Sequence, residues 1–323
     1  MHIFITGASG FVGGAAAQAL LAAGHSVAAM SRSAGSDTVI RHLGAEPVRC
    51  DMESVSAEDI GSADVVIHCA AFVDVWGPRD AWYRGNVLGT RAVLRAAEKA
   101  GVSRFIHIGT EAGIVHGQHI HGADETYPLA PDSPYPYCAT KAQAEQLVLS
   151  ANHSPGFTTL VLRPRFIWGP GDKTLLPAIE KMSAAGNWTW INHGKARTST
   201  IYIDNLVHAI NLALTAGKPG QAYFILDDEV STIHEIVSGM AASKNLELGE
   251  RNIPAWLADF LGAGCEAIWR LFRLKSDPPL TRHAAMVMSR DCVLNGDKAG
   301  RELGYRPLVS VKEGLESMKP GRA

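Results

Sequence analysis

The chain has 323 residues, of which 46% are hydrophobic and 19% are charged, and its formal net charge is −2. This length suits one large α/β domain together with a smaller one. The nearly balanced charge and the absence of any long basic run exclude a nucleic-acid-binding surface, so we expect a small-molecule substrate as the partner.

The first stretch of the chain predicts a nucleotide-binding turn. An apolar run at 2–5 is typical of a buried strand, and an alanine-rich run at 15–23 is typical of a helix. Between them the spacing is G-x-x-G-x-x-G, which lets the backbone approach a pyrophosphate at a helix N-terminus. The residues that we expect to hold a dinucleotide here are Gly7, Ser9, Gly10, Phe11, Val12 and Gly13.

Strand and helix patterns then alternate through the first half of the chain, as a parallel sheet with crossover helices requires. The expected strands are 26–30, 46–50, 64–68, 104–108 and 158–162, and the expected longer helices are 80–100 and 133–152. The sequence therefore predicts an α/β fold with a Rossmann-type doubly wound parallel sheet. Such a sheet binds its ligands beyond the carboxyl ends of the strands.

The end of the second strand carries Ser31 and Arg32, where an acidic residue would select the ribose 2′-hydroxyl. A neutral residue followed by a cation suits a 2′-phosphate, so we expect NADP as the cofactor, with NAD as the second choice. The alternative is that Arg32 is only a solvated surface charge. Just past the third strand, Asp51 and Met52 are expected to bracket the adenine, unless they form a simple loop.

Small residues follow the fourth strand. Ala70 and Ala71 stand where a dinucleotide needs room, and we include them in the expected cofactor site. Their alternative role is ordinary packing.

The sharpest local signal is the Y-x-x-x-K spacing at 137–141. Residues four apart share one helix face, so the Lys141 ammonium can lower the pKa of Tyr137 and let the phenol exchange a proton near neutral pH. Thr110 ends the fifth strand, faces the same crevice and can hydrogen-bond a substrate oxygen. We therefore predict Thr110, Tyr137 and Lys141 as the catalytic residues. The alternatives are a solvated Tyr–Lys pair and a strand-end hydroxyl bonded to backbone.

After residue 165 the pattern changes to turn-rich segments and helices of mixed length. We assign 1–165 to the dinucleotide-binding domain, with 200–217 returning to it. The ranges 166–199 and 218–323 are assigned to a smaller, mixed C-terminal substrate domain.

Together these parts resemble the extended short-chain dehydrogenase/reductase superfamily over nearly the whole chain. N-V-L-G-T at 86–90 is similar to the N-V-x-G-T of that superfamily, and R-P-R-F-I-W-G-P-G at 163–171 to its R-P-x-x-x-Y-G-P-G. Y-I-D-N-L-V-H-A at 202–209 is similar to its Y-V-D-N-L-V-x-A. The resemblance implies that Tyr137 is the catalytic acid/base and that Lys141 binds the nicotinamide ribose. It adds three residues to the expected cofactor site, namely Asn86, Arg163 and Pro164.

Within the superfamily the chain looks most like the 3β-hydroxysteroid dehydrogenase branch. The similar segments are D-E-T at 124–126, T-K-A-Q-A-E at 140–145, L-L-P at 175–177, M-S-R-D at 288–291 and L-G-Y-R-P at 303–307. The resemblance implies an oxidoreductase acting on CH–OH. It would transfer a hydride between the nicotinamide and a secondary alcohol or ketone, such as a 3β-hydroxysteroid or a similar apolar compound.

Two other functions remain as alternatives. The first is a nucleotide-sugar epimerase with tightly bound NAD, and the second is a non-catalytic cofactor-sensing protein of the same fold. Sugar-nucleotide epimerases usually place an arginine where this chain has Thr198, and dehydratases carry Asp-Glu where this chain has Glu111-Ala112. An intact Tyr137 and Lys141 speak against a sensor.

A loop holds three histidines close to two carboxylates. His116, His119 and His121 precede Asp124 and Glu125, and imidazoles with carboxylates can bind a metal ion. We interpret the loop as polar lining near the substrate and expect no metal, because hydride transfer needs none.

Apolar residues recur at helical spacing over 253–274, with basic residues near the far end. Two interpretations are open for this segment, a peripheral contact with a membrane surface and a lid helix that packs on the substrate domain.

Five scattered cysteines without a C-x-x-C pair indicate a reducing compartment. A first strand that starts at residue 2 leaves no room for a signal peptide. We expect a cytoplasmic monomer or homodimer.

Overall fold

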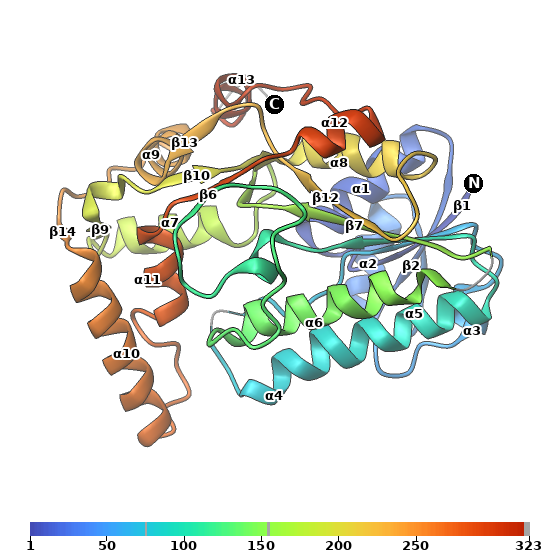
Figure 1. Cartoon of the computed structure of the whole chain (residues 1–323), viewed down its shortest axis with the longest axis horizontal. Helices are drawn as coiled ribbons and strands as arrows, with labels where there is room; N and C mark the ends of the chain where they lie inside the picture. The colour runs from blue at the N-terminus through green and yellow to red at the C-terminus, as the bar shows by residue number, and fades with distance from the viewer. Residues whose placement is uncertain (75, 154–155, 320–323) are drawn as a thin grey trace.

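A parallel seven-stranded sheet forms the centre of the computed structural model, which describes residues 1–74, 76–153 and 156–319 (Figure 1). From edge to edge the strands are β12 (Gln221–Ile225), β7 (Thr158–Pro164), β5 (Arg104–Ile108), β4 (Val65–His68), β1 (His2–Thr6), β2 (Ser26–Met30) and β3 (Glu46–Val48). Successive strands add on opposite sides of β1, so a crevice opens beyond the carboxyl ends of β1 and β4. The predicted doubly wound fold is confirmed.

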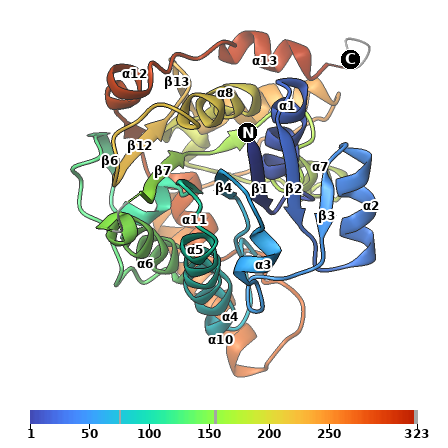
Figure 2. The ribbon, with the colours of Figure 1, turned by 90° about the vertical axis from the view of Figure 1, so that its right-hand side faces the viewer.

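Helices cover both faces of this sheet (Figure 2). One face packs against α1 (Phe11–Ala22) and α8 (Ile203–Ala213), and the other against α5 (Gly89–Lys99) and α6 (Pro136–Ser150). In β1, Ile3 and Ile5 are buried in the core beneath α1 and α8. Phe4 is buried on the opposite face, in the core beneath α5 and α6. A strand buried on both sides must be apolar at every position, which is why the sequence shows continuous apolar runs instead of alternation.

The helix predicted over 80–100 is interrupted. It consists of α4 (Arg79–Trp82), a π-helical segment (Tyr83–Leu88) and α5. The wider turn carries Asn86 inward, where its side chain accepts from the N–H of Phe72 at 2.7 Å and donates to the Phe72 carbonyl at 3.1 Å. A π segment within a helix often marks a functional region, and this one holds the loop that follows β4.

The central sheet with its covering helices is the first lobe of the structure. Smaller sheets and further helices surround it and form the second lobe. A four-stranded sheet has the order β13 (Val230–Thr232), β10 (Arg197–Ser199), β15 (Cys292–Leu294) and β6 (Ile120–Ala123). Two short sheets pair β11 (Ile201–Tyr202) with β8 (Ile167–Trp168), and β14 (Asn252–Ile253) with β9 (Trp190–Ile191). The remaining α-helices of the described residues are α2 (Ala34–His42), α3 (Ala57–Ile60), α7 (Leu175–Ala184), α9 (Ile233–Ser243), α10 (Ala255–Leu271), α11 (Arg282–Ser289), α12 (Asp297–Leu303) and α13 (Val311–Ser317).

The two lobes exchange strands, which the sequence boundaries did not anticipate. β12 comes from 218–323, yet it pairs in parallel with β7 as the edge of the central sheet. Conversely, β6 comes from 1–165, yet it pairs with β15 in the smaller sheet. Helix α8, which lies within 200–217, packs against the central sheet. We propose that 221–225 belongs with the dinucleotide-binding part and 120–123 with the substrate part.

A buried carboxylate joins the two lobes. Asp227 follows β12 and accepts hydrogen bonds from the indole N–H of Trp168 at 3.1 Å and the hydroxyl of Thr200 at 2.8 Å. It also accepts from the backbone N–H of Tyr202 at 3.0 Å and the side-chain amide of Asn205 at 2.8 Å. Trp168, Tyr202 and Asn205 belong to two of the motifs that carry the family resemblance, so those motifs have a structural role here.

We expect Asp227→Ala to destabilise the protein by at least about 3 kcal/mol, because it leaves several buried donors without an acceptor. The measurement is urea unfolding followed by circular dichroism. Asp228→Ala is the matched control, since its side chain is exposed, and we expect a change within about 0.5 kcal/mol. Equal effects of the two substitutions would contradict the structural role of Asp227.

Candidate active site

The glycine-rich turn between β1 and α1 has the shape of a pyrophosphate site. Gly7 has φ +76°, and a Cβ atom there would lie 2.9 Å from the backbone nitrogen of Ala70. A Cβ atom at Gly13 would lie 2.4 Å from the Gly7 carbonyl oxygen, so neither position tolerates a side chain without a shift. The N-cap residue of α1 is Gly10, whose missing side chain leaves the first N–H groups of the helix open to an anion. The turn therefore fits a dinucleotide.

The other predicted residues of this turn have distinct environments. The side chains of Phe11 and Val12 pack against the core of the second lobe, while their backbone lies in the first turn of α1. The carbonyl oxygen of Ser9 accepts a hydrogen bond from the Lys173 ammonium at 2.9 Å. Sequence reasoning missed Lys173, because it lies 164 residues further along the chain and in the other lobe.

At the end of β2, the carboxylate of Asp37 contacts Ser31, one of the two residues predicted to bind the ribose. Arg32 is exposed, whereas Ser31 is buried and donates its hydroxyl hydrogen to Asp37 at 2.5 Å. Asp37 also forms an ion pair with Arg49 from the segment after β3. Sequence reasoning missed Asp37 and Arg49. Both lie beside the position where an adenosine ribose is expected.

Asp51 and Met52 have local roles in the structure. The carboxylate of Asp51 accepts from the hydroxyl and backbone N–H of Ser54, both at 2.9 Å, and these hydrogen bonds hold the pKa of Asp51 below its usual value. Met52 packs on α5, where a Cβ atom at Gly89 would lie 3.1 Å from that of Met52. Their predicted contact with adenine stays a prediction.

Three predicted cofactor residues lie around the loop after β4. Ala70 and Ala71 are half-buried beside the glycine turn. Asn86 is buried, and besides binding Phe72 it donates to the hydroxyl of Thr140 at 3.1 Å. Thr140 lies on α6, so Asn86 connects the loop to the helix that carries the predicted catalytic pair.

Arg163 and Pro164 end β7, where Arg163 is committed to a buried ion pair. Its Nε donates to the Glu145 carboxylate at 2.9 Å, and the two side chains are 3% and 1% exposed. Glu145 lies one helical turn after Lys141 on α6. The ion pair thus fixes the helix against the sheet, and a direct contact of Arg163 or Pro164 with a cofactor stays a prediction.

Thr110, Tyr137 and Lys141 gather beyond the carboxyl end of β5. Thr110 caps the 3₁₀ helix Glu111–Ile114, and its side chain forms a hydrogen bond with Tyr137 from the first turn of α6. One turn further on, the buried Lys141 donates to the carbonyl oxygen of Ile108 at 3.1 Å. Burial lowers the pKa of Lys141 to about 8.

The expected effect of Lys141 on Tyr137 differs in the structure. Burial raises the pKa of Tyr137 well above its usual value, and the negative charge of Glu111 raises it further. The ammonium of Lys141 is directed to the backbone at Ile108, while Glu111 follows Thr110 directly. The phenol is therefore a firmly held proton donor in this structure. Its pKa is raised, whereas the sequence predicted that Lys141 would lower it.

Two buried and uncharged histidines, His68 of β4 and His107 of β5, lie near Lys141. The rings of His68 and His107 are stacked with centroids 5.2 Å apart. His68 lies between the hydroxyls of Thr6 at 2.7 Å and Thr90 at 3.0 Å, and burial lowers its pKa to about 3. Burial also lowers the pKa of His107 well below its usual value. Both rings are neutral near neutral pH, which suits the neighbouring Lys141 cation.

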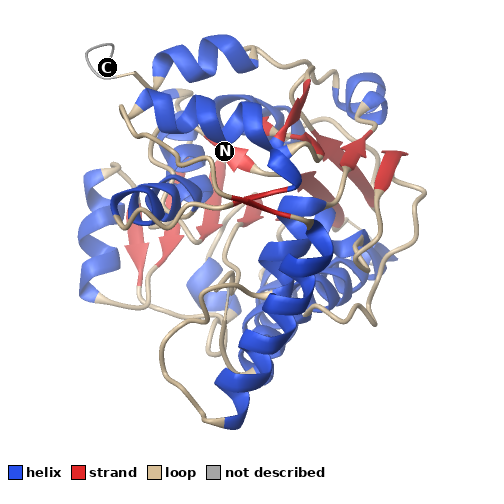
Figure 3. Cartoon of the chain, turned by 90° about the vertical axis from the view of Figure 1, so that its left-hand side faces the viewer, coloured by secondary structure: helices blue, strands red, loops and turns tan. Residues whose placement is uncertain are grey.

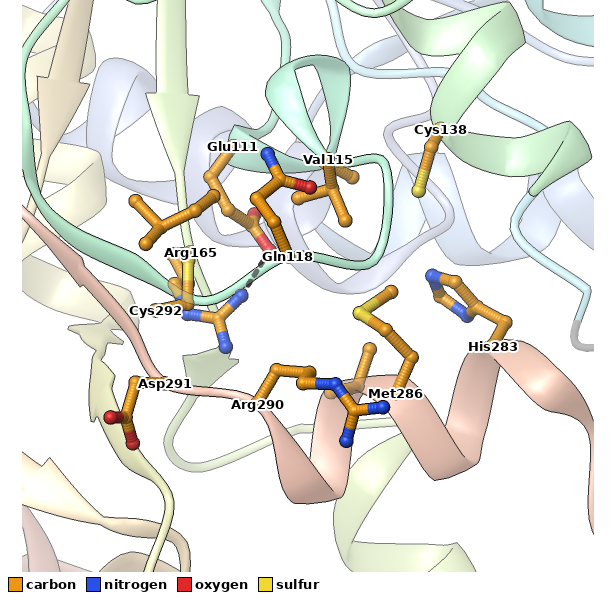
Figure 4. A pocket seen from close by; sticks show the side chains of 13 residues that line it. Glu111, Val115, Gln118, Cys138, Arg165, His283, Met286, Arg290, Asp291 and Cys292 are labelled. Atoms are coloured by element: carbon orange, nitrogen blue, oxygen red, sulfur yellow. Dashed lines mark hydrogen bonds and ion pairs between the residues drawn. The ribbon is translucent and has the colours of Figure 1, made fainter. Parts of the chain in front are cut away.

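A pocket opens beside Thr110 and Tyr137, between the 3₁₀ helix and α11 (Figure 4). Its lining residues are Glu111, Ala112, Val115, Gln118, Ile120, Cys138, Arg165, His283, Met286, Val287, Arg290, Asp291 and Cys292. The His283 ring meets the Tyr137 ring edge-on, with centroids 5.8 Å apart. From the sequence, a substrate contact and a structural hydrogen bond are equally open for Glu111. Sequence reasoning gave no role to Arg165 and His283, because their elements meet only in the folded chain.

The histidine-rich loop is arranged differently from the sequence expectation. His119 and His121 lie with Asp291, whose Oδ2 is 3.6 Å and 3.8 Å from their Nδ1 atoms. Asp124 instead forms a turn with Thr126, and Glu125 accepts from the N–H of Phe224 at 2.8 Å. The two carboxylates named from the sequence are thus engaged elsewhere.

The sheet order, the glycine turn and the Thr, Tyr and Lys arrangement are those of an extended short-chain dehydrogenase/reductase. The chain is accordingly an enzyme, an NAD(P)-dependent oxidoreductase.

More narrowly, residues 4–254 match the model of the 3-beta hydroxysteroid dehydrogenase/isomerase family, and the chain belongs to this family. It is 36% identical to the 4-hydroxy-2-methyl-3-oxo-4-farnesyl-3,4-dihydroquinoline-1-oxide ketoreductase of Stigmatella aurantiaca, over 99% of this chain and 96% of the relative. It is 35% identical to the 2-alkyl-3-oxoalkanoate reductase of Stenotrophomonas maltophilia, over the full length of both. Both the superfamily and the branch expected from the sequence are confirmed.

Among solved structures, the fold is similar to the UDP-glucuronic acid 4-epimerase of Bacillus cereus in complex with NAD. The TM-score is 0.75 at 22% identity, and the match covers 98% of this chain and 96% of the epimerase. This likeness concerns the fold.

Proposed function

We propose that the protein interconverts a ketone and a secondary alcohol on an apolar, ring-bearing or branched compound, with NADP as its preferred cofactor. The observation that supports this most strongly is the junction of Thr110, Tyr137 and Lys141 at the end of β5, next to a turn that fits a dinucleotide. The nicotinamide would supply or accept the hydride when bound.

In this proposal Tyr137 exchanges the proton of the substrate oxygen through its Oη atom. Its raised pKa keeps the phenol protonated at neutral pH, which suits proton donation to a carbonyl under reduction. Thr110 positions the phenol for this step, because its side chain contacts Tyr137. Lys141 would donate to the nicotinamide ribose from its place one turn along α6.

The proposed cofactor site uses the predicted residues of the glycine turn together with the end of β2. Arg32 is exposed there, and Arg49 is half exposed close by. The Asp37 carboxylate is already bound by Ser31 and Arg49, so its repulsion of a 2′-phosphate is reduced. This arrangement supports NADP over NAD.

The pocket lining supports an apolar substrate with a few polar groups. Val115, Ile120, Met286 and Val287 provide apolar surface. The names of the two curated relatives describe 3-oxo compounds that carry a farnesyl or an alkyl substituent. A 3β-hydroxysteroid has the same combination of an apolar body and one reacting oxygen, and we keep it within the proposed substrate class.

A sugar-nucleotide epimerase is the second candidate on the strength of the fold. Thr198, which stands where such epimerases usually have an arginine, is buried and accepts from Arg165 at 2.9 Å. A basic clamp on a substrate diphosphate is therefore not formed at this position. Turnover without any net change in reduced nicotinamide would favour the epimerase.

Helix α10 supports a proposed peripheral contact with a membrane. The helix extends away from the body beside α11 (Figures 1 and 3). Trp256, Phe260 and Leu271 are 69%, 70% and 76% exposed, and only Ala258 and Gly262 of this helix are buried. The helix packs on α11 through Ala258 and Gly262, while much of the predicted apolar stripe is exposed. Three exposed cations stand at its end, namely Arg270, Arg273 and Lys275.

An exposed apolar face next to a cluster of cations is complementary to an anionic lipid surface, which we propose as its occupant. No helix in the described part of the chain has both the length and the apolar character to cross a bilayer.

For the catalytic role of Tyr137, we expect Tyr137→Phe to lower turnover at least about 100-fold, because the proton donor is lost. The assay follows reduced nicotinamide with a panel of 3-oxosteroids, 2-alkyl-3-oxo acids and flavonoid ketones. Tyr135→Phe is the matched control, since this ring also contacts His283 but belongs to the N-cap residue of α6, outside the Tyr137–Lys141 spacing. Unchanged turnover in Tyr137→Phe would refute the role.

For cofactor preference, we expect Arg32→Ala to weaken NADP binding at least about 10-fold, which corresponds to about 1.4 kcal/mol, and to change NAD binding less than about twofold. Fluorescence titration with each dinucleotide measures both constants. Arg41→Ala, an exposed arginine at the far end of α2, should leave both unchanged. An equal effect of Arg32→Ala on the two cofactors would remove Arg32 as the discriminating residue.

For the membrane contact, we expect the wild-type protein to sediment with vesicles that contain phosphatidylglycerol and less with pure phosphatidylcholine. The double variant Phe260→Ser/Leu271→Ser should lose about 10-fold or more of this binding. Leu308→Ser is the control, because Leu308 is 65% exposed on another part of the surface. Absence of vesicle binding, or a wild-type dimer that the double variant converts to a monomer, would overturn the lipid assignment.

A further inference from the structure

A buried chain of polar groups connects the second lobe to Thr110. Nε of Arg165 donates to the Thr198 hydroxyl at 2.9 Å, and Nη1 of Arg165 donates to Oε1 of Glu111 at 2.5 Å. The other carboxylate oxygen of Glu111, Oε2, accepts from the Thr110 hydroxyl at 2.6 Å. Arg165 and Glu111 are 4% and 9% exposed, so the chain is held in a region with little water.

This arrangement decides the direction of the hydrogen bond at Thr110. A hydroxyl has one hydrogen, and that of Thr110 is given to Glu111. The Thr110 oxygen also accepts from the backbone N–H of Ala112 at 3.2 Å, which leaves one acceptor position. With its hydrogen given to Glu111, Thr110 can only accept from the protonated phenol of Tyr137.

The same hydrogen bonds fix how the Glu111 carboxylate is oriented relative to Tyr137. Arg165 binds the carboxylate through Oε1, while Oε2 lies on the side of Thr110 and Tyr137 (Figure 4 shows the Arg165 contact). The Glu111 charge raises the pKa of Tyr137, in addition to burial. The Thr110 contact by itself lowers the pKa of Tyr137, whereas burial and the Glu111 charge outweigh it and favour the protonated form.

The other ionisable groups around Tyr137 do not offset this. His283 of α11 is kept neutral because burial lowers its pKa. Burial raises the pKa of the thiol of Cys138, the next residue on α6, and raises that of Cys292 to about 12, so both stay uncharged. Lys141 is turned to the carbonyl of Ile108.

We propose that Glu111, clamped by Arg165, is a positioning residue that takes the Thr110 hydroxyl hydrogen, holds Tyr137 in its protonated form and thereby favours carbonyl reduction over alcohol oxidation. This inference rests on the proposed function and adds a direction to it. Alcohol oxidation needs a base at Tyr137 to take the hydroxyl proton, whereas ketone reduction needs the phenol proton that this chain retains. Both directions remain catalysed, and their relative rates at a given pH change.

The test is Glu111→Gln, which keeps the shape of the side chain and removes its charge. We expect the pH midpoint of alcohol oxidation to fall by about one unit, and the oxidation-to-reduction ratio of kcat at neutral pH to rise about 10-fold. The substrates are the ketone, and its alcohol, that the wild type turns over fastest in the panel above. An unchanged midpoint and ratio would overturn the proposal.

Two further variants keep the outcome decisive. If Glu111→Gln fails to fold because Arg165 is left without its partner, the double variant Glu111→Gln/Arg165→Met removes both charges and carries the same expectation. Glu302→Gln is the matched control, since this carboxylate accepts from the phenol of Tyr223 at 2.9 Å outside the pocket, and it should leave the midpoint and the ratio unchanged.

The two hypotheses fail in different ways. A wild type whose turnover does not depend on Tyr137 overturns the proposed function. A wild type that depends on Tyr137, with a Glu111→Gln midpoint equal to its own, overturns only the role of Glu111.

Discussion

The hydrogen bond from Lys141 to the carbonyl of Ile108 is the contact on which the arrangement of the site depends. It ties α6 to the end of strand β5 of the central sheet, and a buried ammonium requires such a partner. The bond brings the first turn of α6 over Thr110. The neighbouring His68 and His107 are neutral, so the cation is not opposed by further positive charge. The burial that positions Tyr137 is also the main reason why its pKa is raised.

Several motif residues stabilise the frame around this contact. Arg163 and Glu145 form a buried ion pair one turn from Lys141, and removing one partner of such a pair typically costs about 3–5 kcal/mol. Asp227 collects donors from the segments 167–168 and 200–205. These interactions explain why motifs shared with a family of dehydrogenases do not all mark contacts with ligands. A motif can be required because it holds two lobes in one relative position.

The sequence was sufficient for the central sheet, the glycine turn and the relation of Tyr137 to Lys141, because each depends on local spacing. A continuous apolar run, a positive φ at Gly7 and a pair four apart on one helix are encoded within a few residues. The exchange of β6 and β12 between lobes could not be predicted, because strand pairing depends on partners far along the chain. The same holds for Lys173 at the carbonyl of Ser9, and for Arg165, which lies 54 residues from Glu111. The π segment at Tyr83–Leu88 is set by the fit of Asn86 to its partners, which no periodicity reveals.

The exposed helix α10 is structurally connected to the pocket. Gly262 is buried where α10 crosses α11, and a Cβ atom there would lie 3.1 Å from the backbone nitrogen of Arg282. The next residue, His283, lines the pocket and meets the ring of Tyr137. A surface that holds α10 would therefore act on the helix that forms one wall of the pocket. For an apolar substrate that is concentrated in lipid, this places the proposed membrane contact and the proposed reaction on adjoining elements of one lobe.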